Sequence, residues 1–294
     1  MPIKDPISVH NTAYVLVTPV RNEEALIGRT ISSVLNQTIL PREWMIVSDG
    51  STDSTNAIIE AAIQENPWIK LVKLPQRDGP SFAAVVHNTT LGINKLSTNS
   101  YEFLGLLDSD LEFQANYFEL LINEFHRAPT LGIAGGVAID IGQSRERLPR
   151  NLGEVPGALQ FFRRECFRAI DGLIPVPEGG WDCITCTTAR MKGYETRLVT
   201  KLVVDHLKPR NIIHGGILKR KKQMGIRDYA LGYHPLFEFI KCACRLLSER
   251  PIVIGSLAWY YGYISACLSR HPRLIPPEVM QYMRSEQIKR LFGN

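Results

Sequence analysis

Residues 14–24 read Tyr-Val-Leu-Val-Thr-Pro-Val-Arg-Asn-Glu-Glu, an apolar run followed at once by a polar turn. The segment 14–18 is continuously apolar and ends at Pro19, which is typical of a buried strand. Asn22 is expected to cap a helix, because two acidic residues follow it and a helix dipole favours acids in the first turn. Apolar residues then recur at helical spacing, at Leu26, Ile27, Ile31, Val34 and Leu35. The stretch therefore predicts a strand–turn–helix unit.

The same alternation continues along the next 90 residues. Apolar runs predict strands over 44–47, 69–74 and 103–107, with helices around 57–63 and from 81 to 96. Strands separated by helices of this length predict an α/β fold with a Rossmann-like, mostly parallel sheet. From about residue 131 the alternation loosens at a Gly-Gly pair. There we expect strands over 155–162 and 197–204 and short helices over 164–170 and 182–191.

Composition and charge narrow the class of protein. The 294 residues are 45% hydrophobic and 21% charged, which excludes a disordered chain and a small disulfide scaffold. Residues 1–200 hold 18 basic and 23 acidic side chains, whereas residues 201–294 hold 16 and 6. Such a basic end indicates an anionic partner, but nucleic acid is not expected because no basic–aromatic recognition motif is present. The first residues lack the apolar core of a signal peptide, so a cytoplasmic location is expected.

The last 80 residues differ in character, and we expect a catalytic domain over 1–214 followed by a basic, partly apolar helical extension over 215–294. The extension holds a basic cluster at 219–222 and an uncharged stretch at 251–268 that contains Trp259, Tyr260, Tyr261 and Tyr263. This combination predicts peripheral binding to an anionic cytoplasmic membrane surface. Since a full span needs about 20 apolar residues, a stretch of 18 broken by two glycines is marginal. A buried helix pair or a homodimer contact is the alternative.

Polar clusters follow the predicted strands at 18–23, 48–53, 76–78 and 108–110. In open parallel sheets, ligands bind beyond the carboxyl ends of the strands, so these clusters are expected to meet. The carboxylates of Asp108 and Asp110 repel each other, so a cation is expected between them. Mg²⁺ or Mn²⁺ fits, because oxygens of a diphosphate can complete its octahedral coordination. Neither a G-x-x-x-x-G-K-[ST] nor a G-x-G-x-x-G motif is present, which argues against a P-loop protein and a nicotinamide dehydrogenase.

Three of these clusters resemble a known family. The segments 17–24 (Val-Thr-Pro-Val-Arg-Asn-Glu-Glu), 47–53 (Val-Ser-Asp-Gly-Ser-Thr-Asp) and 108–110 (Asp-Ser-Asp) resemble, in order and separation, the N-terminal signatures of family-2 glycosyltransferases. The resemblance covers about residues 12–210 and includes enzymes of bacterial surface-polysaccharide and glycolipid synthesis. It implies a glycosyltransferase A-type fold, a nucleotide-diphospho-sugar donor, a divalent cation and inversion at the anomeric carbon. The implied acceptor is a saccharide or a lipid-linked saccharide.

The resemblance also assigns binding roles by position. Glu23 is placed near the ribose, and Asp49 is placed where a carboxylate accepts a hydrogen bond from a uracil-type base, which implies a UDP-linked donor. Asp110 is the principal metal-contacting acid, with Asp108 contacting the ribose or the metal through water. The expected donor contacts are thus Thr18, Pro19, Arg21, Glu23, Asp49, Arg77 and Asp108.

An inverting transfer also needs a general base that deprotonates the acceptor hydroxyl. The resemblance places it in the segment Glu178-Gly-Gly-Trp-Asp182, where Asp182 is the expected base and Glu178 the alternative. Trp181 is expected to form a floor beneath a sugar ring, because apolar pyranose faces stack on aromatic rings.

Two further donor elements are expected after the last strand. His206 resembles a histidine that helps to bind the metal or the diphosphate, with a purely structural histidine as the alternative. Arg210 lies in the loop 209–216, together with His214, and this loop is expected to close over the diphosphate.

Two other function classes share such a sheet. A nucleotidyltransferase would carry a Gly-rich basic loop after the first strand, whereas this chain has Val-Arg-Asn-Glu-Glu at 20–24. A catalytically silent nucleotide-sugar-binding protein would not need Asp108, Asp110 and Asp182 together.

Overall fold

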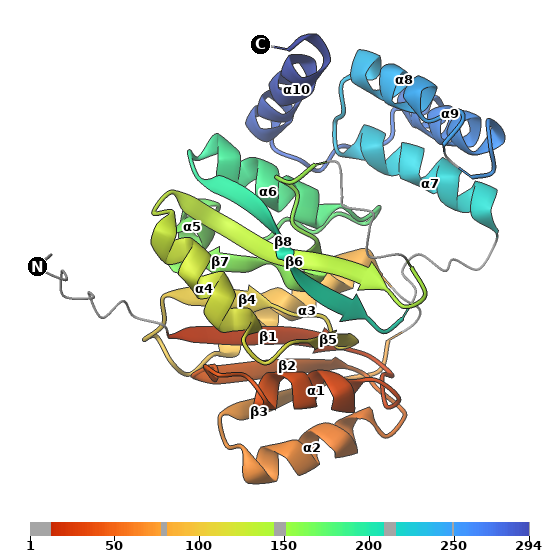
Figure 1. Ribbon diagram of the computed structural model, residues 1–294. Helices are drawn as coiled ribbons and strands as arrows, with labels where there is room; N and C mark the ends of the chain where they lie inside the picture. Colours follow the sequence, from red (N-terminus) through yellow and green to blue (C-terminus); the bar gives the residue numbers. More distant parts are fainter. Residues whose placement is uncertain (1–12, 78–80, 144–150, 209–215, 249, 294) are drawn as a thin grey trace, which may run out of the picture.

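The computed structural model describes residues 13–77, 81–143, 151–208, 216–248 and 250–293. Its centre is an eight-stranded sheet with the order β3-β2-β1-β4-β7-β6-β8-β5 (Figure 1). The strands are β1 (Tyr14–Val20), β2 (Glu43–Asp49), β3 (Ile69–Leu74), β4 (Phe103–Leu106), β5 (Leu111–Phe113), β6 (Leu131–Asp140), β7 (Phe161–Arg163) and β8 (Glu195–His206). Strands β1–β4 and the pair β6–β8 are parallel, while β7 and β5 pair antiparallel with their neighbours. The mostly parallel α/β sheet is therefore confirmed.

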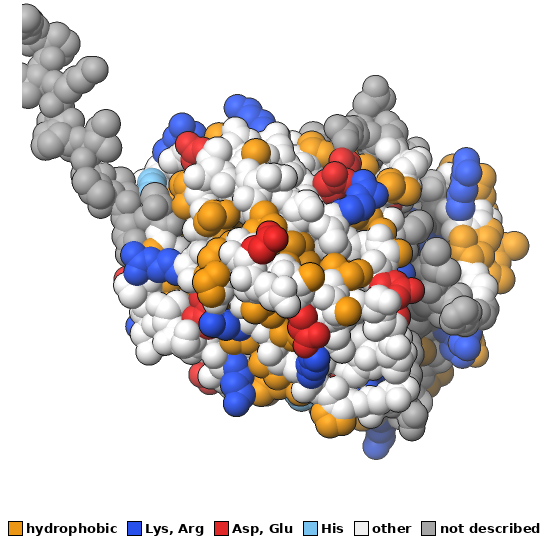
Figure 2. Space-filling model, turned by 90° about the horizontal axis from the view of Figure 1, so that it is seen from below, with side chains coloured by type: hydrophobic (Ala, Val, Ile, Leu, Met, Phe, Trp, Pro, Cys, Tyr) orange, Lys and Arg blue, Asp and Glu red, His pale blue; other side chains and the backbone are white. Residues whose placement is uncertain are grey.

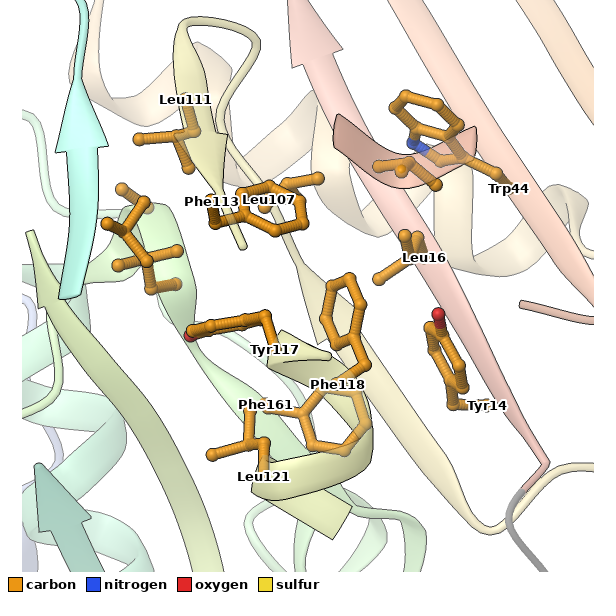
Figure 3. Packing of buried hydrophobic residues seen from close by; sticks show 14 of the residues in the cluster. Tyr14, Leu16, Trp44, Leu107, Leu111, Phe113, Tyr117, Phe118, Leu121 and Phe161 are labelled. Carbon is orange, nitrogen blue, oxygen red and sulfur yellow. The ribbon is translucent and has the colours of Figure 1, made fainter. Parts of the chain in front are cut away.

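Helices cover both faces of this sheet, as Figure 1 shows. Those within residues 13–206 are α1 (Ile27–Leu35), α2 (Thr55–Glu65), α3 (Phe82–Lys95), α4 (Tyr117–Arg127), α5 (Arg164–Ala169) and α6 (Trp181–Met191), with a short 3₁₀ helix η1 (Gly157–Leu159). Alternate residues of β1 enter opposite cores. Tyr14 and Leu16 pack with α1, α2 and α4 (Figure 3), whereas Val15 and Val17 pack with α3, α6 and the C-terminal helix. Two apolar layers thus fix the sheet from both sides.

The turn after β1 differs from the expected helix cap. Helix α1 begins at Ile27 and has no side-chain cap, while Asn22 lies four residues before its N-cap with φ at 51°. The Asn22 side-chain oxygen instead accepts a hydrogen bond from the Thr52 amide at 2.8 Å. The prediction of an N-cap at Asn22 is wrong, because an asparagine tolerates this left-handed conformation and joins the two loops there.

The middle of the chain also departs from the prediction. The strand expected over 155–162 is wrong, since residues 157–159 form η1 and only Phe161–Arg163 forms the short antiparallel β7. The Gly-Gly pair at 135–136, which seemed to interrupt the pattern, lies inside the unpredicted ten-residue β6. A Cβ atom on Gly135 would lie 2.4 Å from the carbonyl oxygen of Leu159. The glycine therefore permits η1 to pack directly on β6.

The C-terminal extension is a group of four helices, α7 (Ile217–Ala230), α8 (Pro235–Cys244), α9 (Ile254–Leu268) and α10 (Pro277–Phe292). Helices α7 and α9 cross at two glycines: a Cβ on Gly225 would lie 1.9 Å from the Trp259 carbonyl oxygen, and one on Gly262 would lie 2.0 Å from that of Lys222. Gly262, one of the two glycines that interrupt the apolar stretch, thus allows close backbone packing against α7. Among the described helices, none has both the length and the apolar character needed to cross a membrane.

A buried charge holds the extension together. The Asp228 side chain is fully buried, pairs with Arg227 and Lys241, and accepts a hydrogen bond from the Trp259 indole at 2.8 Å. The Arg227 and Lys241 cations hold the pKa of Asp228 below its usual value against the opposing effect of burial. A buried carboxylate needs such partners, so Asp228 ties α7 to α8 and α9.

Candidate active site

A cavity of about 310 Å³ lies beyond the carboxyl ends of β1, β2 and β4. Because these strands are parallel neighbours, the polar residues that follow them meet at one edge of the sheet. The lining residues are Pro19, Val20, Arg21, Glu23, Asp49, Arg77, Ser81, Val85, Asn88, Asp108, Ser109 and Asp110. The structure thus brings together most of the expected donor contacts.

One side of this cavity carries a candidate metal site. One ligand atom from each of Asp108, Asp110 and His206 lies within 4.8 Å of the others. The antiparallel pairing of β5 with β8 brings them together, because it sets Leu111 opposite His206 and lets the Leu207 amide donate to the Asp110 carbonyl at 2.8 Å. His206 is buried, and its Nε2 lies 3.6 Å from Asp110 Oδ1.

The donor set suits a divalent cation. Two carboxylates and an imidazole offer two hard oxygen ligands and one nitrogen, a combination that Mn²⁺ accepts in octahedral geometry. The other ring nitrogen of His206 contacts the Lys208 carbonyl oxygen at 2.5 Å and lies 3.8 Å from Asp140 Oδ1. Such outer contacts fix the imidazole orientation that a metal ligand requires.

On the opposite side of the cavity, Arg77 binds the buried carboxylate of Asp49. The Arg77 Nε donates to both Asp49 oxygens, at 2.9 and 2.8 Å. Arg21 supports the pair, since its Nη2 donates to the Arg77 carbonyl at 2.7 Å and its Nη1 lies 3.9 Å from Asp49 Oδ2. Gly50, with φ at 63°, permits this approach because a Cβ there would lie 2.5 Å from the Gln76 Cα.

Glu23 lines the cavity and forms an ion pair with a residue that the sequence did not indicate. The Lys208 ammonium lies 2.7 Å from Glu23 Oε1, although 185 positions separate the two residues. Burial raises the pKa of Glu23, while the contact with Lys208 opposes that rise. Lys208 follows His206 by two residues, so the final strand delivers both a candidate metal ligand and a cation to the site.

The expected base lies on a neighbouring element. Asp182 stands in the first turn of α6, where its Oδ2 accepts a hydrogen bond from the Gly157 amide at 3.1 Å and its Oδ1 accepts one from the Cys183 amide at 3.0 Å. Gly157 begins the 3₁₀ helix η1, and the carbonyl oxygen of the next residue, Ala158, accepts a hydrogen bond from the Asp108 amide at 3.1 Å. The turn η1 therefore connects Asp182 with the acidic edge of the cavity. Glu178 instead contacts His271 in the extension, at 2.6 Å.

Two of the expected contacts have other placements. Thr18 is fully buried, and its hydroxyl accepts a hydrogen bond from the Trp44 indole at 2.9 Å, so its side chain lies beneath the cavity floor. Trp181 is only 9% exposed and packs against Gly157 within the second core. Arg210 and His214 lie outside the described residues.

A second cavity, of about 420 Å³, lies between α6 and the extension. Of the cations that line it, Arg190, Arg227 and Lys241 are each paired with a carboxylate, and Arg245 and Arg290 line it as well. Arg190, for example, contacts both Glu286 and Glu154. The Arg190–Glu286 pair joins α6 to the extension.

The sheet order and the position of the cavity at the carboxyl ends of the parallel strands are those of a GT-A type fold. The sequence profile described as "Glycosyl transferase family 2" matches residues 15–181, and the chain belongs to that family. The match covers the strands and loops that form the cavity, and it confirms the family that the three motifs indicate.

Curated relatives agree with this assignment over part of their length. The chain is 31% identical over 132 residues to the chondroitin synthase of Pasteurella multocida (strain Pm70), which is 45% of this chain and 13% of that protein. It is 32% identical over 123 residues to the minor teichoic acid biosynthesis protein GgaA of Bacillus subtilis (strain 168), which is 40% of this chain and 26% of that protein. The chain thus matches only a minor part of each relative.

Solved structures show the same fold over nearly the whole chain. The mannosyltransferase PcManGT from Pyrobaculum calidifontis, in complex with GDP-Man and Mn²⁺, has a TM-score of 0.56 and 18% identity, covering 96% of this chain and 87% of that one. Residues 1–349 of S. aureus TarS, in complex with UDP-GlcNAc, have a TM-score of 0.57 and 13% identity, covering 96% and 92%. At such identities the likeness establishes the fold.

Proposed function

We propose that this glycosyltransferase transfers a sugar from a UDP-linked donor to an acceptor hydroxyl, with inversion at the anomeric carbon. The carrying observation is the convergence of Asp108, Asp110 and His206 at the edge of a cavity whose other side holds Asp49. The diphosphate of a nucleotide sugar needs a cation, which the carboxylates and His206 could hold. Its nucleobase needs a hydrogen-bonding group, which Asp49 could supply on the other side of the cavity.

The base end of the donor is assigned to Asp49. A buried carboxylate can accept a hydrogen bond from the N3–H of uracil. It could also accept from the N1–H and N2–H of guanine, so the choice of uracil rests on the family resemblance of this position. Arg77 and Arg21 hold this carboxylate in a fixed orientation. Glu23 and Asp108 then lie between the base and the metal, where the ribose would be held.

The diphosphate end is assigned to Asp110, His206 and Asp108, which would hold Mn²⁺ or Mg²⁺. When bound, the cation offsets the negative charge that develops on the leaving nucleoside diphosphate. Lys208, which contacts Glu23 at the mouth of the cavity, supports the same charge from the protein side. Arg210 is proposed to add to it from the loop 209–216.

Asp182 is proposed as the general base. Its carboxylate accepts hydrogen bonds from two backbone amides, which hold it in one orientation and leave its remaining lone pairs for an acceptor hydroxyl. It would take the proton of that hydroxyl as the oxygen attacks the anomeric carbon on the face opposite the diphosphate. Trp181 supports the role through position, because its buried indole fixes the first turn of α6.

The acceptor and the place of action form the remaining part of the proposal. Relatives are named for chondroitin and for minor teichoic acid biosynthesis, which favours a saccharide or a lipid-linked saccharide as the acceptor. We place the reaction at the cytoplasmic face of a membrane, with residues 1–214 forming the catalytic domain and residues 215–294 an extension for contact with the membrane or a second copy.

A nucleotide-release assay tests the proposed function. The full chain is incubated with UDP-, GDP- and dTDP-sugars and Mn²⁺, and the released nucleotide is identified by chromatography. The proposal predicts release of UDP from a UDP-sugar and little turnover of a GDP-sugar, whereas a dTDP-sugar, whose base offers the same N3–H, tests whether the site also requires the ribose 2′-hydroxyl. Release of pyrophosphate would identify a nucleotidyltransferase, and binding without any release would identify a silent nucleotide-sugar-binding protein.

A further inference from the structure

Helices α8 and α9 both present apolar side chains to solvent at helical spacing. On α8 the exposed positions include Leu236 and Phe239, and on α9 they include Ile254, Leu257, Tyr261 and Leu268. Phe239, Leu257 and Tyr261 are 54%, 56% and 60% exposed. Because the rings of Phe239 and Tyr260 are in contact, with centroids 5.8 Å apart, the two stripes form one surface. We call these six exposed side chains the α8–α9 apolar face.

Helix α9 is apolar on both of its sides. Its inner side packs on α7 through Trp259, Gly262 and Tyr263, which are all buried. Its outer side carries the α8–α9 apolar face, and residues 254–268 contain no charged side chain. A helix that is hydrophobic all round is normally covered on all sides. The outer side of α9 therefore calls for an occupant.

The charges around this face have one sign. Among the described residues of the range 216–277, the only acids are Asp228 and Glu238, and both are fully buried. Exposed cations are present at Lys219, Lys222 and Arg270, and the Lys222 ammonium lies 5.2 Å from the centre of the Tyr261 ring. In Figure 2, which views the molecule from below, hydrophobic side chains lie beside lysine and arginine side chains at the right-hand edge, on the side of the C-terminal helices.

We infer that the α8–α9 apolar face docks on an anionic lipid leaflet, with its exposed cations at the headgroups. This inference rests on the proposed function, which places the reaction at a membrane, and it adds which surface of the protein contacts that membrane. A two-fold contact with a second copy is disfavoured, because it would set the same cations against one another. A lipid surface satisfies both the apolar face and the cations around it.

This contact differs from the one expected from the sequence. Trp259 and Tyr263 are 3% and 1% exposed, so two of the four aromatic side chains of α9 are internal. Lys221 is also buried, with its ammonium 5.4 Å from the centre of the Trp259 ring. Docking therefore depends on Phe239, Leu257 and Tyr261, assisted by the exposed lysines of α7.

Vesicle flotation of the full chain tests the inference. Vesicles of phosphatidylcholine alone are compared with vesicles that also contain phosphatidylglycerol, at low and high salt. The wild type is expected to float with the anionic vesicles. The double variant Phe239→Glu/Leu257→Glu is expected to remain unbound, whereas Leu40→Glu, a control at a 47% exposed leucine of the catalytic domain, is expected to float as the wild type does.

A second pair of variants tests the contribution of the exposed cations to vesicle binding. Replacing Lys219 and Lys222 by glutamine removes two cations near the surface and is expected to lower the partition coefficient about thirtyfold at low salt. Replacing the exposed Lys70 and Lys192 of the catalytic domain removes the same charge and is expected to have little effect. An equal loss in both double variants would mean that net charge, and not this face, directs binding.

Three results would overturn the inference. These are failure of the wild type to float at low salt, equal flotation with neutral vesicles, and a dimer in sedimentation velocity that Phe239→Glu/Leu257→Glu converts to monomer. Donor affinity is measured on the same samples by titration with UDP. A wild-type chain that binds UDP but does not float would reject the membrane contact alone. A wild-type chain that does not bind UDP would reject the proposed function.

Discussion

Replacing Gly225 by alanine would add a Cβ atom 1.9 Å from the Trp259 carbonyl oxygen and 2.5 Å from the Tyr263 amide nitrogen. Both atoms belong to the backbone of α9, so no change of rotamer relieves the overlap. Helices α7 and α9 would have to separate by about 1.5 Å to restore ordinary van der Waals distances. The variant therefore tests whether the apolar stretch of the extension packs within the protein.

The expected effect is a balance of two opposing contributions. Overpacking costs about 1–3 kcal/mol, and a rigid backbone neighbour places this site at the upper end. Alanine gains about 1 kcal/mol over glycine in a helix interior. Gly225→Ala is therefore expected to lower the free energy of unfolding by about 2 kcal/mol, although helix propensity alone predicts the opposite sign.

Urea denaturation followed by tryptophan fluorescence and circular dichroism measures this change, because Trp259 lies in the contact. Gly28→Ala is the matched control: Gly28 lies within α1, and the nearest atom to its added Cβ would be 4.0 Å away. The control is expected to be neutral or to gain up to about 1 kcal/mol. A Gly225→Ala variant as stable as the wild type would refute the close crossing of α7 and α9.

Two further predictions concern the proposed base and the buried charges of the extension. Asp182→Asn is expected to lower turnover by about 10²–10⁴-fold with UDP affinity near that of wild type; parallel loss of UDP binding in a titration would instead make Asp182 a donor contact or a structural residue. Burial raises the pKa of Glu238 from 4.5 to about 6, so the native state retains a proton that the unfolded chain releases, and stability falls as the pH rises through this window. Glu238→Gln is expected to remove about 2 kcal/mol of that fall, measured by urea denaturation at pH 4.5 and 7, and an unchanged pH dependence would contradict it.

The sequence predicts the first half of the fold well, for a local reason. Strands β1 to β4 are short apolar runs that end in polar turns, and the parallel pairing of such strands brings Asp49 and Asp108 to one edge. The family motifs lie on these turns. The candidate site could therefore be located from residues that are near one another in sequence.

The remaining features depend on contacts between distant segments. The three-residue strands β5 and β7 have too few residues for a periodic signal, yet β5 places His206 beside Asp110. The contact of Lys208 with Glu23 is visible only once β8 has joined the sheet. Gly262 likewise reads as an interruption of an apolar run in the sequence, because the close packing that it allows depends on α7, which crosses it.

The central claim is that Asp108, Asp110 and His206 hold a divalent cation that binds the donor diphosphate. Calorimetric titration of the full chain with UDP, with and without Mn²⁺, tests it in wild type, Asp110→Asn and the control Glu112→Gln, which removes an exposed carboxylate two residues away. Mn²⁺-dependent UDP binding is expected in wild type and in Glu112→Gln, and its loss is expected in an Asp110→Asn variant that remains folded. Mn²⁺-dependent binding of undiminished affinity in Asp110→Asn would contradict it.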